Sequence, residues 1–193
     1  PYGPAKDIAP NMLVINQLFP VKKTVSALIM LASAKLGCVN SASSSNGSSG
    51  HLAAELFKSM AQVNIVRVSY KGAGQAINNL IAGEVQLMFP AAGAAEQHIR
   101  SGRVRVLPVT SLEPSALPPD LPTLDTALPG FESLMIYDLF VPARTRPAIL
   151  QRLQKETAQF VHLAEIQEKP RGAGVEVIGD APTQLAARFK ADM

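Results

Sequence analysis

The chain has 193 residues, of which 47% are hydrophobic, 17% are charged and 5% are aromatic. This apolar content excludes a disordered chain and is typical of one or two modest domains with a buried core. The net charge is +3, and the basic residues are scattered rather than gathered on one stripe, which argues against a nucleic-acid-binding protein. The composition therefore favours a small-molecule partner, and the mild positive charge is compatible with an anion.

Few features of the sequence indicate a compartment or a cofactor. Cys38 is the only cysteine, so the chain can form no internal disulfide, and disulfides are permitted but not required outside the cytoplasm. No apolar run is long enough to cross a membrane, and Pro1–Pro4 shows no signal-peptide pattern. The three histidines lie far apart in the sequence and no spacing favours a metal site, so we expect neither a metal nor another cofactor.

In chain order, the apolar pattern first predicts a strand at 12–16. A helix follows, with Thr24 as its N-cap and Gly37 at its end. Three units come next that each consist of a strand, a loop and a helix, and one more strand follows them. These four predicted strands span residues 39–42, 63–70, 85–89 and 104–110.

Alternating strands and helices are the pattern of a parallel sheet covered by helices. Right-handed crossovers put the loops after the first three of those strands at one edge of the sheet. In open α/β sheets, ligands bind beyond the carboxyl ends of the strands. We therefore predict that the three loops form one wall of a single binding site.

The later part of the chain has a different composition. Five prolines between residues 112 and 130 preclude a long helix, so we expect an irregular connector with a short helix near 123–127. An apolar strand is expected at 133–141. The remaining predicted elements are helices at 147–163 and 164–169, a strand at 175–178 and a final helix that begins near residue 181.

The loop Ser43–Gly50, with the sequence SSSNGSSG, joins a short strand to an amphipathic helix. The first backbone N–H groups of a helix have no partner within it and carry a partial positive charge, which favours anions. Gly47 and Gly50 let the backbone approach a ligand closely, and the serine hydroxyls add donors. Because the loop has no lysine or arginine, we predict that it holds an anion by neutral dipoles.

Enzyme motifs do not fit this loop. A Walker-type phosphate loop ends in Gly-Lys-Ser/Thr, whereas Ser49-Gly-His51 stands here, and the pattern of a nucleophile elbow or of a dinucleotide fingerprint is also broken. Ser49 and His51 could form an acyl-transfer pair, but no carboxylate is placed by the sequence to orient it. A packed or capping role is the simpler interpretation of His51.

A series of short motifs runs along the chain. The longest is NGSSGHLAAELFK at 46–58, and VSYKG at 68–72 follows it. Shorter ones are QLMF at 86–89, HIRSG at 98–102, LPT at 121–123, PGFE at 129–132 and YDLFVP at 137–142. In this order they resemble the Bug-type solute-binding proteins of the tripartite tricarboxylate transporters, and the resemblance covers nearly the whole chain.

The resemblance implies a two-lobed, hinge-closing receptor of the type II periplasmic-binding fold, which is an α/β architecture. It also implies a periplasmic protein that delivers a small organic carboxylate to the membrane permease subunits of a tripartite transporter, without chemistry of its own. We expect residues 17–136 to form the complete second lobe. Residues 1–16 and 137–193 would belong to a first lobe that is incomplete in this chain, with the strands at 12–16 and 133–141 as crossovers.

The loop chemistry and the resemblance together give a set of candidate ligand-binding residues from the three loops. For Lys71 a solvated loop side chain is the alternative to ligand contact. One different class of function stays open, the effector domain of a transcription regulator with the same two-lobed architecture. The candidate residues are Ser43, Ser44, Asn46, Gly47, Ser48, Ser49, Tyr70, Lys71, Gly72, Pro90 and Ala91.

Overall fold

A five-stranded sheet forms the centre of the fold. Its strands are β2 (Met12–Asn16), β3 (Asn40–Ser43), β4 (Val66–Ser69), β5 (Leu87–Met88) and β6 (Val104–Val109). They lie in the order β4-β3-β5-β2-β6. The computed structural model describes residues 9–16, 24–34, 37–112, 121–135, 137, 139–163, 166, 183, 187 and 190.

The strand directions decide which loops meet. β3 pairs in parallel with both β4 and β5, so the carboxyl ends of these three strands share one edge of the sheet. β2 pairs antiparallel with β5 and with β6, which brings the amino end of β2 and the carboxyl end of β6 to the same edge. We call it the loop edge. The prediction that the three loops share one edge is confirmed.

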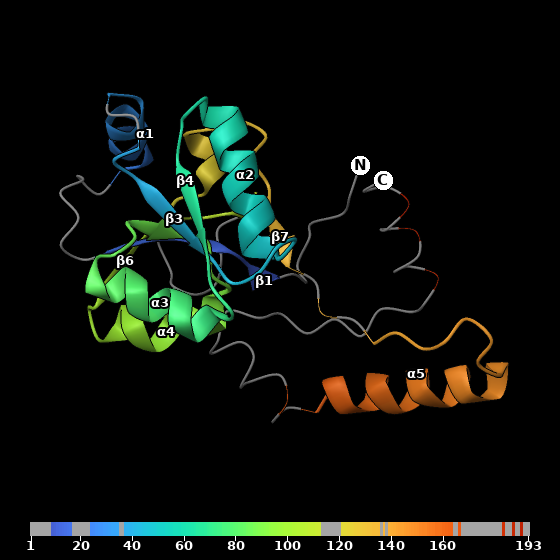
Figure 1. The fold of residues 1–193 in the computed structure, drawn as a ribbon. Helices are drawn as coiled ribbons and strands as arrows, with labels where there is room; N and C mark the ends of the chain where they lie inside the picture. Colours follow the sequence, from blue (N-terminus) through green and yellow to red (C-terminus); the bar gives the residue numbers. More distant parts are fainter. Residues whose placement is uncertain are drawn as a thin grey trace.

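Helices cover both faces of this sheet (Figure 1). Two of them pack with one buried cluster and two with another, which gives three layers. The strand β2 serves both clusters, because successive side chains of a strand point to opposite faces. Leu13 and Ile15 join the cluster under α1 (Val25–Ala34) and α2 (Ser49–Ala61), whereas Met12 and Val14 join the cluster under α3 (Ala73–Ala82) and α4 (Ala92–Arg100).

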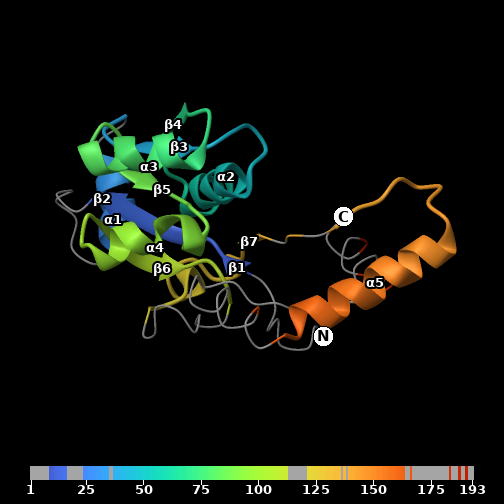
Figure 2. The same ribbon diagram turned by 90° about the horizontal axis from the view of Figure 1, so that it is seen from below.

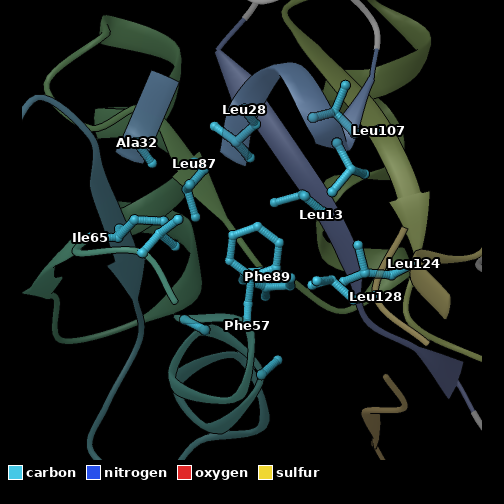
Figure 3. Close-up of a cluster of buried hydrophobic side chains, with 14 of the residues drawn as sticks. Leu13, Leu28, Ala32, Phe57, Ile65, Leu87, Phe89, Leu107, Leu124 and Leu128 are labelled. Atoms are coloured by element: carbon cyan, nitrogen blue, oxygen red, sulfur yellow. The ribbon is translucent and has the colours of Figure 1, made fainter. Parts of the chain in front are cut away.

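The cluster under α1 and α2 contains a pair of phenylalanines that fixes α2 on the sheet (Figure 3). The ring centroids of Phe57 in α2 and Phe89 after β5 are 5.7 Å apart, and the rings are tilted by 51°. Both side chains are fully buried. Tilted aromatic pairs of this kind add to the stability that area burial gives.

Most predicted elements are confirmed, with shorter strands than expected. Thr24 caps α1, since its Oγ1 accepts from the amide of Ala27 at 3.3 Å. The expected strand at 63–70 is regular only over β4, although Val63 and Ile65 are buried before it. The short helix near 123–127 is the 3-10 helix η1 (Leu124–Thr126).

The expected strand at 133–141 is reduced to β7 (Leu134–Met135), which pairs antiparallel with β1 (Ala9–Pro10). The predicted boundary between residues 16 and 17 separates β2 from the second lobe, whereas β2 is hydrogen-bonded between β5 and β6. β2 therefore belongs to this sheet, and the division of the chain into two lobes stays a prediction.

The helix α5 (Pro147–Val161) confirms the helix expected at 147–163 and stands apart from the sheet and its helices (Figure 2). None of its side chains is buried. In the part of the chain that is described, no helix has the length and apolar character needed to cross a membrane. The elements expected at 164–169 and 175–178 and the helix from residue 181 lie outside the described residues, apart from single positions.

Candidate functional site

The first turn of α2 lies at the loop edge and is built by the SSSNGSSG loop. Ser48 is the N-cap, and its Oγ accepts from the amide of His51 at 3.3 Å and donates to the carbonyl of Ser45 at 2.9 Å. The amide of Gly47 donates to His51 Nδ1 at 2.9 Å. The amides of Ser49 and Gly50 have no acceptor among the described residues. The helix therefore presents two free N–H groups at its positive end.

A close backbone approach sets the position of this turn. A Cβ at Gly50 would lie 2.3 Å from the carbonyl oxygen of Phe89, at the end of β5. Only glycine allows α2 to begin this close to the strand. Gly47 has a φ of +73°, a left-handed conformation that glycine adopts without strain. Gly50 thus permits a close approach to the backbone of Phe89 and Gly47 permits the turn, whereas their predicted approach to a ligand stays a prediction.

Arg67 in β4 holds the same loop from the side, and sequence reasoning missed it. Its Nη1 donates to Ser43 Oγ at 3.0 Å, and its Nη2 donates to Asn46 Oδ1 at 2.7 Å. The loop itself has no basic residue, as the sequence shows, and its binding of an anion by neutral dipoles stays a prediction. The positive charge comes from the neighbouring strand rather than from the loop itself.

Asn11, just before β2, is a second residue at this edge that the sequence did not single out. Its side chain is fully buried, and its Nδ2 has no hydrogen-bond partner within the described ranges. Ser49 Oγ lies 3.5 Å from Asn11 Oδ1 and 3.1 Å from Met135 Sδ. The backbone of Asn11 is fixed by Thr110, whose amide and hydroxyl both donate to its carbonyl, at 3.0 and 2.8 Å.

The second loop follows β4. The amide of Tyr70 donates to the carbonyl of Ser43 at 2.9 Å, which joins the first and second loops. Lys71 is exposed, and its amide donates to Gln75 Oε1 at 3.4 Å. Gly72 is the N-cap of α3 and has extended backbone, with no side chain to cap the helix. This loop presents a second helix amino end at the loop edge.

The third loop, after β5, is bound to the backbone of β2. The carbonyl of Pro90 accepts from the amide of Met12 at 3.0 Å, and Ala91 forms an antiparallel bridge with Asn11. Ala91 is also the N-cap of α4. Pro90 itself is buried.

The predicted ligand-binding residues thus lie at the loop edge, but they differ in their exposure and in their hydrogen bonds. Ser44 is half-buried, and Asn46 and Gly47 are exposed. The hydroxyl of Ser43 is buried and already engaged by Arg67. Whether each of these residues contacts a ligand stays a proposal.

Ser49 and His51 do not form a nucleophile and base pair. The hydroxyl of Ser49 is directed to Met135 and Asn11, whereas His51 uses Nδ1 to accept from Gly47 and has Nε2 4.0 Å from Glu55. The capping interpretation of His51 is therefore confirmed. Among the described residues, no cluster of three or more His, Cys, Asp or Glu side chains could hold a metal ion.

Comparison with known proteins places this chain in a family. A model of the tripartite tricarboxylate transporter family receptor matches residues 6–193. The chain belongs to this receptor family. A relative from Pseudomonas sp. (strain P51), the "UPF0065 protein in tcbD-tcbE intergenic region", is 33% identical over 172 residues, which cover 88% of the chain and 51% of that relative. The chain thus spans about half the length of this relative.

Solved structures show the same fold. R. palustris Rpa4515 with adipate has a TM-score of 0.89 and 31% identity, over 99% of this chain and 67% of that one. The periplasmic binding protein BugD has a TM-score of 0.87 and 27% identity, over 95% of this chain and 62% of BugD. The α/β periplasmic-binding fold and the Bug-type resemblance are therefore confirmed.

Proposed function

We propose that this chain is the ligand-binding part of a periplasmic receptor that captures a small organic carboxylate and delivers it to the membrane permease of a tripartite transporter. Family membership supports the class of function. The observation that carries the ligand chemistry is the amino end of α2, where two N–H groups have no acceptor among the described residues, at an edge shared by three loops. A carboxylate bound there supplies the missing acceptors and the missing negative charge.

Two polar side chains support a carboxylate at this position. The hydroxyl of Ser49 has a thioether as its nearer acceptor, and sulfur is a weak acceptor, so a carboxylate oxygen can replace it favourably. The Nδ2 of Asn11 is a buried donor without a partner in the described part of the chain, at the same turn of α2. Buried donors that lack an acceptor are costly, and an incoming oxygen atom would relieve that cost.

The proposed ligand is an organic acid, and the proposed role is binding without chemistry. Rpa4515, which is 31% identical over almost the whole chain, was solved with adipate, so a linear dicarboxylate is the first probe. The Ser49 hydroxyl and the His51 ring each have other partners, which supports binding without nucleophilic chemistry. The family match favours the receptor over the effector-domain alternative.

The first test is calorimetric titration of the full-length protein with adipate, followed by a crystal structure of the complex. We expect one binding site, with a carboxylate within hydrogen-bond distance of the amides of Ser49 and Gly50. A ligand bound at the opposite edge of the sheet would contradict the site. No binding of adipate or of any other short dicarboxylate or monocarboxylate would contradict the function.

Replacing Ser49 by alanine should weaken adipate binding about tenfold, because the bound carboxylate loses a hydroxyl donor. Ser59, which is exposed near the carboxyl end of the same helix, provides the matched control. Ser59→Ala removes the same atom far from the loop edge, and its affinity should equal that of the unmodified protein. Equal affinities of Ser49→Ala and Ser59→Ala would show that the Ser49 hydroxyl takes no part in binding.

A further inference from the structure

Arg67 is connected to the loop of the proposed site through two donors of one guanidinium group. The two acceptors, Ser43 Oγ and Asn46 Oδ1, stand 24 and 21 residues away in the sequence. The first is at the end of β3 and the second is in the turn that leads into α2. One side chain therefore spans the segment that bends from the strand into the helix.

No carboxylate of the described residues pairs with the charge of Arg67. The residue is half-buried, and no ion pair joins it to an acidic side chain of the described ranges. Its two acceptors are both neutral groups. The helix α2 begins three residues after Asn46, and its amino end carries a partial positive charge as well. Asn46 thus links Arg67 to the segment that begins α2, no acidic side chain of the described part of the chain pairs with Arg67, and an anion near both positive features lowers their energy.

We propose that Arg67 is a positioning residue that holds the SSSNGSSG loop in its anion-binding shape and makes the site prefer ligands of higher negative charge. This inference rests on the function proposed above and deepens it. The planar guanidinium presents fixed donors to two acceptors at once, so its contacts set the distance between Ser43 and Asn46. A lysine in its place keeps the charge but concentrates it on one atom, which cannot reproduce that geometry.

Three variants, made in the full-length protein, separate the effect of Arg67 on the shape of the loop from the effect of its charge. Arg67→Gln removes both the charge and the planar pair of donors, whereas Arg67→Lys keeps only the charge. Arg103→Gln is the control. Arg103 is exposed and precedes β6, whose first residue pairs with the last residue of β2, so it lies at the opposite edge of the sheet. Each protein is titrated with straight-chain dicarboxylates and with their mono-methyl esters, which have one charge fewer at similar length.

We expect Arg67→Gln to bind the dicarboxylate about tenfold more weakly, with a smaller preference over the monoester and a flatter dependence on salt. Arg67→Lys should recover the preference and the salt dependence but not the full affinity. Amide hydrogen exchange without ligand should be faster around Gly47 in both Arg67 variants, because the loop is less constrained. Arg103→Gln should match the unmodified protein in affinity and in exchange around Gly47.

The outcomes are distinct. If Arg67→Gln binds both ligands as the unmodified protein does, the inference is overturned and the proposed function stands. If Arg67→Gln is too unstable to titrate, Arg67→Lys decides, since slow exchange around Gly47 together with full affinity would overturn the inference. If the unmodified protein binds no carboxylate, the proposed function fails and the inference fails with it.

Discussion

Gly50→Ala is expected to destabilise the fold by about 2–3 kcal/mol, although alanine is the better helix former. A Cβ at this position would lie 2.3 Å from the carbonyl oxygen of Phe89 and 3.4 Å from its carbonyl carbon. Both atoms belong to the backbone, so they cannot swing away as a flexible side chain would. The start of α2 must then move off the end of β5, which loosens the contact between Phe57 and Phe89.

Gly74→Ala is the matched control for this prediction. Gly74 is the second residue of α3, as Gly50 is of α2, but a Cβ at Gly74 meets nothing within 4 Å. This variant should keep the stability of the unmodified protein or raise it by up to about 1 kcal/mol, because alanine has less conformational freedom to lose on folding. Urea denaturation of both variants measures the difference. Equal midpoints would mean that the close approach of α2 to β5 does not constrain the fold.

The order of elements was predictable because each unit carries a local signal. Thr24 precedes an apolar helix and caps it, and glycines mark the loops that follow the strands. The lengths of the strands were less predictable. Val63 and Ile65 are buried and apolar like the residues of β4, yet they precede the ladder with β3. Burial is thus visible in the sequence, but the point where strand pairing begins is not.

The position of β2 shows what a local pattern leaves open. The run Met12–Ile15 is apolar without alternation, and in the structure its side chains are buried on both faces of the sheet. Such a run is typical of a central strand, and this signal could have placed it inside the lobe. Its neighbours β5 and β6 lie about 70 to 100 residues further along the chain, and no local sequence feature identifies them as its pairing partners.

The backbone features of the candidate site were predictable from the sequence, but its side-chain contacts were not. The SSSNGSSG loop contains the glycines, the N-cap serine and the helix start, so its own sequence indicates its chemistry. Arg67 reaches that loop only because the register of β3 and β4 pairs Ser41 with Arg67. Asn11 reaches it because β2 runs antiparallel to β5. Both contacts depend on strand register, which a single sequence does not specify.

Gly47→Val is expected to cost about 1–3 kcal/mol of stability and to weaken carboxylate binding about a hundredfold. Gly47 has a φ of +73°, and a β-branched side chain does not adopt this conformation without strain. Relaxing the strain would turn the amide of Gly47 away from His51 Nδ1 and shift Asn46 against Arg67. The amides of Ser49 and Gly50 would then no longer be held in place for the proposed carboxylate.

Gly37 offers a control that separates strain from binding. It has a φ of +75°, it is exposed, and a Cβ there would meet nothing within 4 Å, as at Gly47. Gly37 precedes β3, so it lies at the edge of the sheet opposite the loop edge. Gly37→Val should therefore lose a similar amount of stability in urea denaturation while its affinity for adipate in calorimetry stays unchanged. If both variants lose affinity equally, binding follows overall stability rather than the shape of this loop. If Gly47→Val binds normally despite its loss of stability, the carboxylate does not depend on the turn before α2.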